Sequence, residues 1–458
     1  MGDMGKPSTL RRRLPQLFAA LSATLGGFSL GAVLGWTSPA SEPLRRQLGL
    51  SDETVSWLAG VTPLGALAAM LAAAVLLDRV GRRRALLATA PPFVAGWLLL
   101  AFCRHPAALL VGRFVTGFCG GAFSTAAPVY IGEIAEKDIR GALGVCYQLL
   151  LTGGILYVYV VGKWAPLVWL SVVCAIPPIL FFVLFFFVPE SPIFLLSKDR
   201  REEAIRALHW FRGGDEADIT DDLAEMEQSV TETKERTGSL RDMFTSRAAV
   251  RGLAIGVGLQ LAQQLSGVNI IIFFSVPIFV AAGTSMDPSD CAIVVGVVQV
   301  ASTLLSTLLV ERAGRRVWLV LSLSGMGVCM VVLGVYFHLK QQNAAAVAGV
   351  GWLPLLAMCA YLLTYSLGTG PLPWAMIGEL FPGEIKGIAS SICGGANWIL
   401  CFIVSKTFTN LVDAFGTAVT FWVYAGICFV AATWIFFFVI ETRNKPLAQI
   451  QKELAGKS

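Results

Sequence analysis

Two short, charged stretches of the chain are nearly identical. LLDRVGRR occupies Leu76–Arg83 and LVERAGRR occupies Leu309–Arg316, so an acid-Arg-x-Gly-Arg-Arg pattern recurs after 233 positions. Carboxylates and guanidinium groups attract one another, so the chemistry that these residues can supply is ion pairing. A single basic stretch of this kind would be explained most simply as an anchor on the inner side of a membrane.

Two further stretches match in the same way and change that interpretation. YIGEIAEKDIRG and MIGELFPGEIKG align Glu133 with Glu379 and Arg140 with Lys386, and each pair is 246 positions apart. Matched sets of charges at such similar spacings predict an internal duplication of the chain.

Other kinds of chemistry find little support in the sequence. The ten cysteines form no C-x-x-C pair and lie mostly in apolar stretches, so we expect small core residues, no disulfide framework and no metal site. The three histidines, His105, His209 and His338, are scattered and are expected to be ordinary surface or boundary residues. The sequence contains no glycine-rich phosphate loop and no nucleophile elbow. We therefore expect neither enzyme activity nor a cofactor.

The charged stretches lie between long apolar segments that must position them. Hydrophobic residues make up 55% of the 458 residues and charged residues 14%, with a mean hydropathy of +0.69, which is too apolar for a soluble protein of this length. A helix of about 20 apolar residues crosses the hydrocarbon core of a bilayer. Twelve such spans are predicted, at 17–38, 55–77, 85–103, 107–132, 141–162, 167–189, 252–275, 291–310, 317–339, 353–377, 385–406 and 417–440.

The distribution of positive charge predicts how these spans are oriented. Cytoplasmic segments of membrane proteins are richer in Lys and Arg. With both termini in the cytoplasm, 28 of the 35 Lys and Arg residues fall on the inner side. We therefore expect a multi-pass protein of the plasma membrane or of an intracellular vesicle membrane, with both termini cytoplasmic. The pI near 8.7 reflects this asymmetry and requires no nucleic-acid partner.

A charged segment between the sixth and seventh spans divides the chain. In REEAIRALHWFRG, one side of a predicted helix carries apolar residues, at Ala204, Ile205, Leu208 and Phe211. A second, acidic helix is predicted around DITDDLAEMEQSV. Six spans on either side of an insert are the signature of a transporter built from two related halves. The predicted units are an N-terminal six-helix half (1–189), a cytoplasmic helical linker (190–251), a C-terminal six-helix half (252–440) and a short cytoplasmic tail (441–458).

Six motifs resemble those of the sugar transporters of the major facilitator superfamily. They are DRVGRR and ERAGRR after spans two and eight, PESPIFLL after span six, QQLSGVN in span seven, GTGPLPW in span ten and IETR after span twelve. The resemblance covers nearly the whole chain, and within the family it points to the intracellular-type facilitative hexose transporters and the insect facilitated trehalose transporters. It implies an all-α membrane protein of twelve transmembrane helices in the major facilitator fold. The implied function is alternating-access transport of a neutral sugar, a hexose such as glucose or trehalose, in the lipid bilayer and with no obligate protein partner.

The resemblance also implies where the sugar binds. Asn and Gln offer a donor and an acceptor to sugar hydroxyls without the desolvation cost of a charge, and Trp suits the ring face. The residues implied at the cavity are Gln148, Gln263, Gln264, Asn269, Gln299, Trp374 and Asn397. A membrane-buried amide can instead bridge two helices, and this alternative is favoured for Gln299 taken alone.

Three further groups of residues are implied to take part in gating. Phe273 and Phe274 stand where relatives usually carry two tyrosines as an outer lid, so we expect an apolar lid. Helix breakers, at Gly368, Gly370, Pro371 and Pro373, predict a bend in span ten that is either a hinge or a static kink. A cytoplasmic latch of ion pairs between the halves is implied for Arg82, Arg83, Arg113, Glu133, Arg140, Arg315, Arg316, Glu379 and Lys386. Arg113 differs from the others because it lies inside an apolar run, where an unpaired charge is costly.

Departures from the family pattern bear on the gates. Ile193 stands where relatives usually have Arg, Ile440 where they have Pro, and Ser366 where many hexose carriers have Glu. These three replacements predict a weaker latch than in relatives.

Three functions compete on this evidence: a facilitative uniporter, a proton-coupled sugar or polyol symporter, and a non-transporting sugar receptor. Proton-driven relatives carry an Asp in span one at the place that Val33 occupies here, and no Asp or Glu occurs between Asp3 and Glu42. A receptor would be expected to carry a long cytoplasmic tail, whereas 17 residues follow Glu441. Both observations favour uniport.

Overall fold

The chain folds into a helical bundle whose spans match the apolar segments of the sequence. The computed structural model describes residues 9–214, 219–235, 244, 246–309 and 314–456, and within these residues it contains helices and no strand. Twelve helical segments are long and apolar enough to cross a membrane, which confirms the predicted fold class. Residues 310–313 of the second charged stretch lie outside the described residues.

Six spans precede the central insert. They are α1 (Thr9–Gly35), α3 (Asp52–Val80), α4 (Arg82–Phe102), α5 (Pro106–Ile134), α6 (Lys137–Trp164) and a sixth span divided into α7 (Leu167–Cys174) and α8 (Ile176–Phe185). A shorter helix, α2 (Thr37–Leu48), links the first two spans. Small residues let these helices approach closely: a Cβ on Gly31 of α1 would lie 1.9 Å from the carbonyl oxygen of Leu151 in α6.

Six further spans follow the insert. They are α13 (Arg247–Leu265) with α14 (Val268–Phe273), α16 (Pro288–Leu309), α17 (Arg315–Gln342), α18 (Leu353–Leu367) with α19 (Leu372–Leu380), α20 (Gly383–Phe415) and α21 (Thr417–Phe438). Shorter helices complete this half: α15 (Ser275–Ala282), the 3-10 helix η1 (Ala344–Val350) and α22 (Leu447–Ala455). The two halves pack on each other through α3 against α20 and through α6 against α16.

The insert forms α9 (Pro192–Ser197), α10 (Arg201–Phe211) and α11 (Thr220–Glu235). On α10, Ala204, Leu208 and Phe211 are fully buried, and they belong to the same apolar core as the first six spans. The second six spans form the other core, which also includes Ala59, Ile155 and Tyr159 of the first half. The insert is therefore attached to the N-terminal half.

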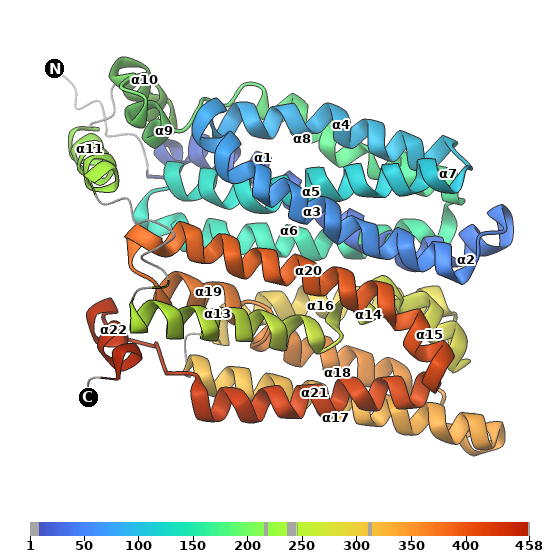
Figure 1. The fold of residues 1–458 in the computed structure, drawn as a ribbon. Coiled ribbons are helices and arrows are strands. Elements are labelled where there is room, and N and C mark those ends of the chain that lie inside the picture. The colour runs from blue at the N-terminus through green and yellow to red at the C-terminus, as the bar shows by residue number, and fades with distance from the viewer. Residues whose placement is uncertain (1–8, 215–218, 236–243, 245, 310–313, 457–458) are drawn as a thin grey trace.

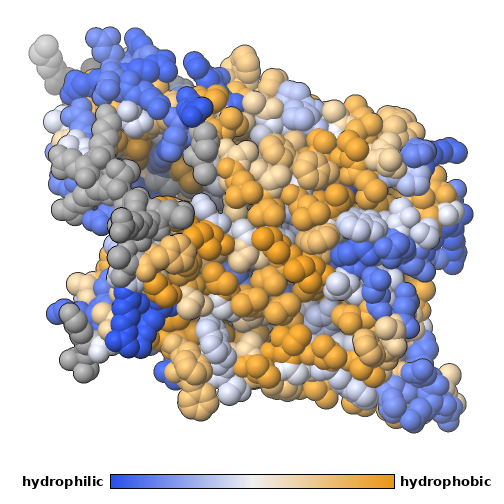
Figure 2. All heavy atoms as spheres, viewed as in Figure 1, coloured by the Kyte–Doolittle hydropathy of each residue, from blue (hydrophilic) through white to orange (hydrophobic). Residues whose placement is uncertain are grey.

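Two ends of the bundle can be distinguished in Figure 1. Both chain ends, α9–α11 and α22 lie at one end, which we call the terminal face, and α2 and α15 lie at the other end, which we call the opposite face. Figure 2 shows apolar side chains over the middle of the bundle and hydrophilic ones gathered toward both ends. This pattern is the one expected of a protein that crosses a bilayer.

Candidate functional site

Spans seven and ten are both interrupted, and one side chain joins the two interruptions. Span seven breaks between α13 and α14 at Gly267, whose φ is 89°. Span ten breaks between α18 and α19, where residues 368–371 are not helical. The Nε2 of Gln263 donates to the carbonyl oxygens of Thr369 and Gly370, at 2.7 and 2.9 Å. An amide of one broken span thus satisfies backbone groups that the other break leaves free, as burial in a membrane requires.

Further amides extend this contact into a cluster. The Nδ2 of Asn397, from α20, donates to the Oε1 atoms of Gln260 and Gln263, at 2.6 and 2.8 Å. The Nδ2 of Asn269 donates to Gln264 Oε1 and lies 3.1 Å from the Sγ of Cys401. We call Gln260, Gln263, Gln264, Asn269 and Asn397 the amide cluster; each is at most 7% exposed. Four of its members were implied by the resemblance.

Gln260 is the member that the sequence did not single out. It lies one helical turn before Gln263 and Gln264, so its spacing on α13 was the available signal. Its Oε1 accepts from Asn397, while its Nε2 is buried without a hydrogen-bond partner. A buried amide donor without a partner costs free energy, so a hydrogen-bond acceptor placed beside this atom would stabilise it.

The other three candidate binding residues lie apart from the amide cluster. Gln299 is buried on α16 and its Oε1 has no partner, whereas Gln148 is exposed on α6. Trp374 on α19 is 46% exposed, and a Cβ on Gly394 of α20 would lie 3.7 Å from its ring. Among the described residues, no hydrogen bond joins Gln148, Gln299 or Trp374 to the amide cluster. Gln148 shares a face of α6 with Tyr159, eleven residues or three turns further on.

That face of α6 meets the C-terminal half near the opposite face. The Oη of Tyr159 donates to the carbonyl oxygen of Ile272, at 2.6 Å. The backbone N–H of Val276 donates to the Oγ of Ser38 at the start of α2, at 3.0 Å. The phenylalanines expected to form a lid, Phe273 and Phe274, lie between these two contacts and are 0% and 2% exposed. The segment that carries them is therefore fastened to the N-terminal half on both sides.

Ion pairs also join the halves at the opposite face. Lys163 at the end of α6 pairs with Asp290 at the start of α16. Lys406 on α20 pairs with Glu53 at the start of α3, with a distance of 2.9 Å between Nζ and Oε1.

The residues expected to form a latch make different pairs at the terminal face. Arg82 pairs with Glu133 at 3.0 Å, inside the N-terminal half, and Arg315 pairs with Glu379 at 3.3 Å, inside the C-terminal half. Lys386 is exposed and has no ion-pair partner among the described residues. In the part of the chain that the structure describes, no ion pair among the latch residues crosses between the halves.

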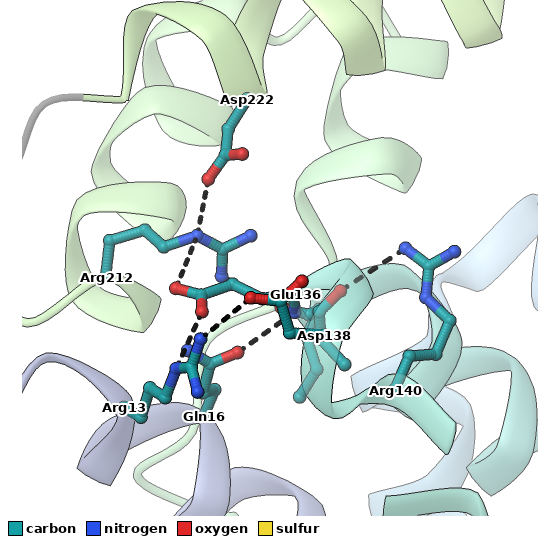
Figure 3. Close-up of polar contacts among 9 residues, drawn as sticks. Arg13, Gln16, Glu136, Asp138, Arg140, Arg212 and Asp222 are labelled. Carbon is teal, nitrogen blue, oxygen red and sulfur yellow. Dashed lines mark hydrogen bonds and ion pairs between the residues drawn. The ribbon is translucent and has the colours of Figure 1, made fainter. Parts of the chain in front are cut away.

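Arg140, the other exposed latch residue, lies beside a polar network that Figure 3 shows. Its guanidinium donates to the carbonyl oxygen of Ala135, at 3.3 Å. In the network, Arg13 pairs with Glu136 and Asp138, at 3.0 and 3.1 Å. A second arginine ties the insert to this network: Arg212, after α10, is 2% exposed and donates to Asp222 of α11 at 2.6 Å and to the carbonyl oxygen of Ile134 at 3.0 Å.

The repeated glycine-arginine stretches have a structural role in both halves. The backbone N–H of Arg83 donates to Glu190 at 2.8 Å, and those of Arg315 and Arg316 donate to Glu441 at 2.9 and 3.1 Å. Each carboxylate, from PESP or IETR, therefore sits at the N-terminus of a helix, where N–H groups lack intrahelical partners. We call these two contacts the carboxylate clasps, and the sequence did not predict them.

The clasps explain why both stretches carry a glycine before the two arginines. A Cβ on Gly81 would lie 2.5 Å from the Oε2 of Glu190, and a Cβ on Gly314 would lie 2.3 Å from the Oε2 of Glu441. Burial opposes the ionisation of Glu441, but backbone N–H donors, led by that of Arg443, outweigh burial and lower its pKa below the ordinary value.

The second arginine of each stretch lies over a phenylalanine ring. The guanidinium carbon of Arg83 is 5.9 Å from the ring centroid of Phe186, and that of Arg316 is 4.9 Å from that of Phe436. These contacts place both cations against the end of the last span in their own half.

Arg113 does not belong to the latch. It lies near the start of α5, twenty residues or about 30 Å along the helix from Glu133, so it is near the opposite face. Its guanidinium is fully buried and donates to the carbonyl oxygens of Leu58 and Val33, at 3.1 and 2.9 Å, and to Thr37 Oγ1 at 2.9 Å. Its charge is held by backbone carbonyls and by the ring of Trp36, 5.1 Å away, so the expectation that Arg113 joins the latch was wrong.

Comparisons with known proteins agree with the architecture. The family described as sugar (and other) transporter matches residues 17–454. The chain is 38% identical over 448 residues to the facilitated trehalose transporter Tret1 of Aedes aegypti, covering 96% of this chain and 55% of that one. It is 37% identical to the proteins of the same name from Polypedilum vanderplanki and Bombyx mori, of which it covers 88% and 87%. The chain thus spans about half of the Aedes relative and most of the other two.

Solved structures show the same fold. The proton:xylose symporter XylE bound to 6-bromo-6-deoxy-D-glucose superposes with a TM-score of 0.77 at 25% identity, over 96% of this chain and 99% of that one. An inward-open structure of the xylose transporter XylE from E. coli superposes with a TM-score of 0.81 at 24% identity, over 96% and 99% of the two chains.

Proposed function

Because the chain belongs to the sugar (and other) transporter family, we propose that it is a facilitative uniporter that moves a neutral sugar across a membrane by alternating access. The amide cluster supports this proposal. Its members offer neutral donors and acceptors between two interrupted spans, so a substrate rich in hydroxyls can exchange hydrogen bonds with them and leave again. Charged groups would instead favour an ionic substrate.

The position of the carboxylates in the spans is the main support for uniport. Every Asp and Glu in the twelve spans lies within two residues of a span end. Proton coupling needs a carboxyl group whose proton occupancy changes as the sugar moves, which calls for a group close to the sugar. In span one, Val33 is fully buried, and its carbonyl oxygen accepts from Arg113. Proton-coupled symport is the second candidate because a similar solved structure carries that description.

Trehalose is the first substrate to test and glucose the second. The relatives at 36–38% identity are described as facilitated trehalose transporters. The cluster gives hydroxyl-binding atoms on α13, α14 and α20, and Gln148, Gln299 and Trp374 would extend the site across α6, α16 and α19. A disaccharide would use both sets.

The terminal face is proposed to be cytoplasmic, in agreement with its excess of Lys and Arg. The halves are joined by polar contacts at the opposite face, while the latch residues pair within their own halves. This arrangement supports an inward-open state, in which the lid of Phe273 and Phe274 is closed and the latch is released. An outward-open state would reverse both sets of contacts.

Uptake by proteoliposomes tests the function. Purified protein should equilibrate radiolabelled trehalose across the membrane and should not concentrate it when an inward proton gradient is imposed. Accumulation above the outside level, abolished by an uncoupler, would establish symport instead. Saturable sugar binding without flux would establish a receptor.

A further inference from the structure

A pocket outside the sugar site lies at the terminal face, between the start of α4, the link from α8 to α9, and α10. Its volume is about 370 Å³. Its polar wall carries four arginines and two carboxylates: Arg83, Arg84, Arg200 and Arg206, with Glu190 and Glu203. We call it the α4–α10 pocket. Its lining therefore has two more positive charges than negative ones.

Two of these arginines are available to a ligand. Arg200 is already paired with Glu203, with 2.7 Å between Nε and Oε1, and Glu190 is engaged by the backbone N–H of Arg83. Arg84 and Arg206 are exposed, and among the described residues neither has a carboxylate within ion-pairing distance. The charges of both arginines nevertheless reach the carboxylate of Glu203. The pKa of Glu203 is lowered by the hydrogen bond from Arg200 and further by the charges of Arg200, Arg206 and Arg84.

Arg83 adds a buried donor beside this wall. Its Nη2 donates to the carbonyl oxygen of Phe186 and its guanidinium lies over the ring of Phe186, but its Nε is buried without a hydrogen-bond partner. A guanidinium with an unused N–H, next to two free ones, is suited to a phosphate group, which accepts several charge-assisted hydrogen bonds at once.

The same pocket adjoins the apolar surface of the membrane spans. The candidate span of α4 begins at Arg82, so Arg83 and Arg84 lie at the level where a span enters the headgroup layer. Phe186 and Phe187, directly after α8, are 53% and 73% exposed. Exposed phenylalanine at the end of a span faces lipid chains. The aromatic Phe194 and Trp210 line the pocket from the insert.

We propose that the α4–α10 pocket binds the headgroup phosphate of an anionic phospholipid in the leaflet at the terminal face. The free guanidinium groups contact the phosphate, and the acyl chains lie along Phe186 and Phe187. A net positive pocket at the edge of transmembrane helices is a known type of site for anionic headgroups, and it disfavours lipids of no net charge. Because α4 and α10 both contribute, the bound lipid also fastens the insert to the first six spans.

Lipid binding to purified, full-length protein tests this proposal. The double variant Arg84→Gln/Arg206→Gln removes both free charges from exposed side chains, so folding should survive. Lys452→Gln is the matched control, because Lys452 is exposed on α22 at the same face but in the other half. In nanodiscs of phosphatidylcholine with increasing phosphatidylserine, phosphatidylserine should raise the Tm of the parent protein and of Lys452→Gln. The double variant should need about tenfold to thirtyfold more phosphatidylserine for the same rise.

Three results would overturn the assignment. An undiminished response of the double variant would place the lipid elsewhere. If the parent protein has the same Tm in pure phosphatidylcholine as in nanodiscs with phosphatidylserine, the pocket has no preference for an anionic headgroup. Equal protection by inorganic phosphate in phosphatidylcholine nanodiscs would assign the pocket to a soluble phosphate. None of these readouts requires sugar transport, so the test is independent of the proposed function.

Discussion

The two halves hold their buried polar groups in different ways. In the N-terminal half, a fully buried guanidinium, Arg113, is bonded to backbone carbonyls of α1 and α3, which are continuous helices. The matched position in the second half, 246 residues further on, is Cys359. There, neutral amides bond to the ends of two interrupted spans. Amides can exchange partners at little cost, whereas a buried charge cannot lose its partners, so we infer that the first half is the rigid one and the second the adaptable one.

Replacing Arg113 should have the largest effect. Arg113→Ala leaves the carbonyl oxygens of Val33 and Leu58 without these donors and opens a cavity, which should lower the free energy of unfolding by about 3 to 5 kcal/mol. Cys359→Ala, at the matched position, should cost about 1 kcal/mol or less. Thermal unfolding in detergent measures both.

Arg113→Lys separates charge from geometry in this test. A lysine keeps the charge but cannot reach three acceptors in a fork, so an intermediate loss is expected. If Arg113→Ala and Cys359→Ala lower the free energy of unfolding equally, the two halves tolerate such replacements equally and the proposed difference between them is wrong.

Amide substitutions should affect binding rather than folding. Gln264→Ala should weaken sugar binding by about 1 to 3 kcal/mol, because it removes the Oε1 that accepts from Asn269 and leaves substrate hydroxyls without that amide. Gln148→Ala, in the rigid half, should weaken it less. Isothermal titration calorimetry with trehalose measures the affinity of both variants, and their Tm serves as the folding control. An unchanged affinity in folded Gln264→Ala would remove this residue from the site.

The two carboxylate clasps offer a comparison at matched glycines. Gly81 has a φ of 102°, which L-residues rarely adopt, whereas Gly314 has a φ of −64°. Gly81→Ala therefore incurs backbone strain, which should lower the free energy of unfolding by about 1 to 2 kcal/mol, and it also displaces Glu190. Gly314→Ala incurs only the displacement of Glu441. A smaller fall in Tm for Gly81→Ala than for Gly314→Ala would refute this order.

The second clasp should also depend on pH. The pKa of Glu441 is lowered in the folded protein, so its contribution is complete above the unfolded value of about 4.3 and is lost as pH falls through the folded value. Glu441→Gln should therefore be less stable than the parent near pH 7, by about 1 kcal/mol after allowance for solvent exposure, and the gap should close below about pH 4. A gap that persists at low pH would mean that the charge of Glu441 is not what stabilises the clasp.

The smallest effect is expected at the latch. Within the described parts of the chain Lys386 pairs with no carboxylate, so Lys386→Gln should leave the Tm unchanged and destabilise only a conformation in which the halves pair across the terminal face. The free-energy difference between the two conformations should change by less than about 1 kcal/mol. A cysteine introduced at Gly141, which has open space around it, should be labelled faster in Lys386→Gln than in the parent. Slower labelling would contradict the latch.

Apolar composition and length were sufficient to predict the twelve spans, because burial in lipid imposes a strong constraint on composition. The same constraint explains the interruption of span ten, since Gly368 and Pro371 cannot continue a helix without outside partners. The partners themselves were not predictable. Gln263 bonds to Thr369, 106 residues away in sequence, and no local pattern encodes such a distance.

Side-chain charge alone misplaced Arg113. Its residue type suggested an ion pair, yet two of its three acceptors are the backbone carbonyls of Val33 and Leu58. Every residue carries such a carbonyl, so no sequence pattern marks these two. The clasps escaped prediction for the same reason: Glu190 and Glu441 bind backbone N–H groups rather than the arginine side chains beside them.

Each clasp closes its half on itself, because it fastens the end of the last span to the start of the third. A polypeptide that ended soon after either carboxylate would therefore contain every contact of its own clasp. The covalent connection between the halves then serves mainly to raise the effective concentration of one half near the other. Two separately translated halves would need only to meet in the same membrane at sufficient density to restore the pair. A gene duplication followed by fusion is the evolutionary route that such self-closing units permit.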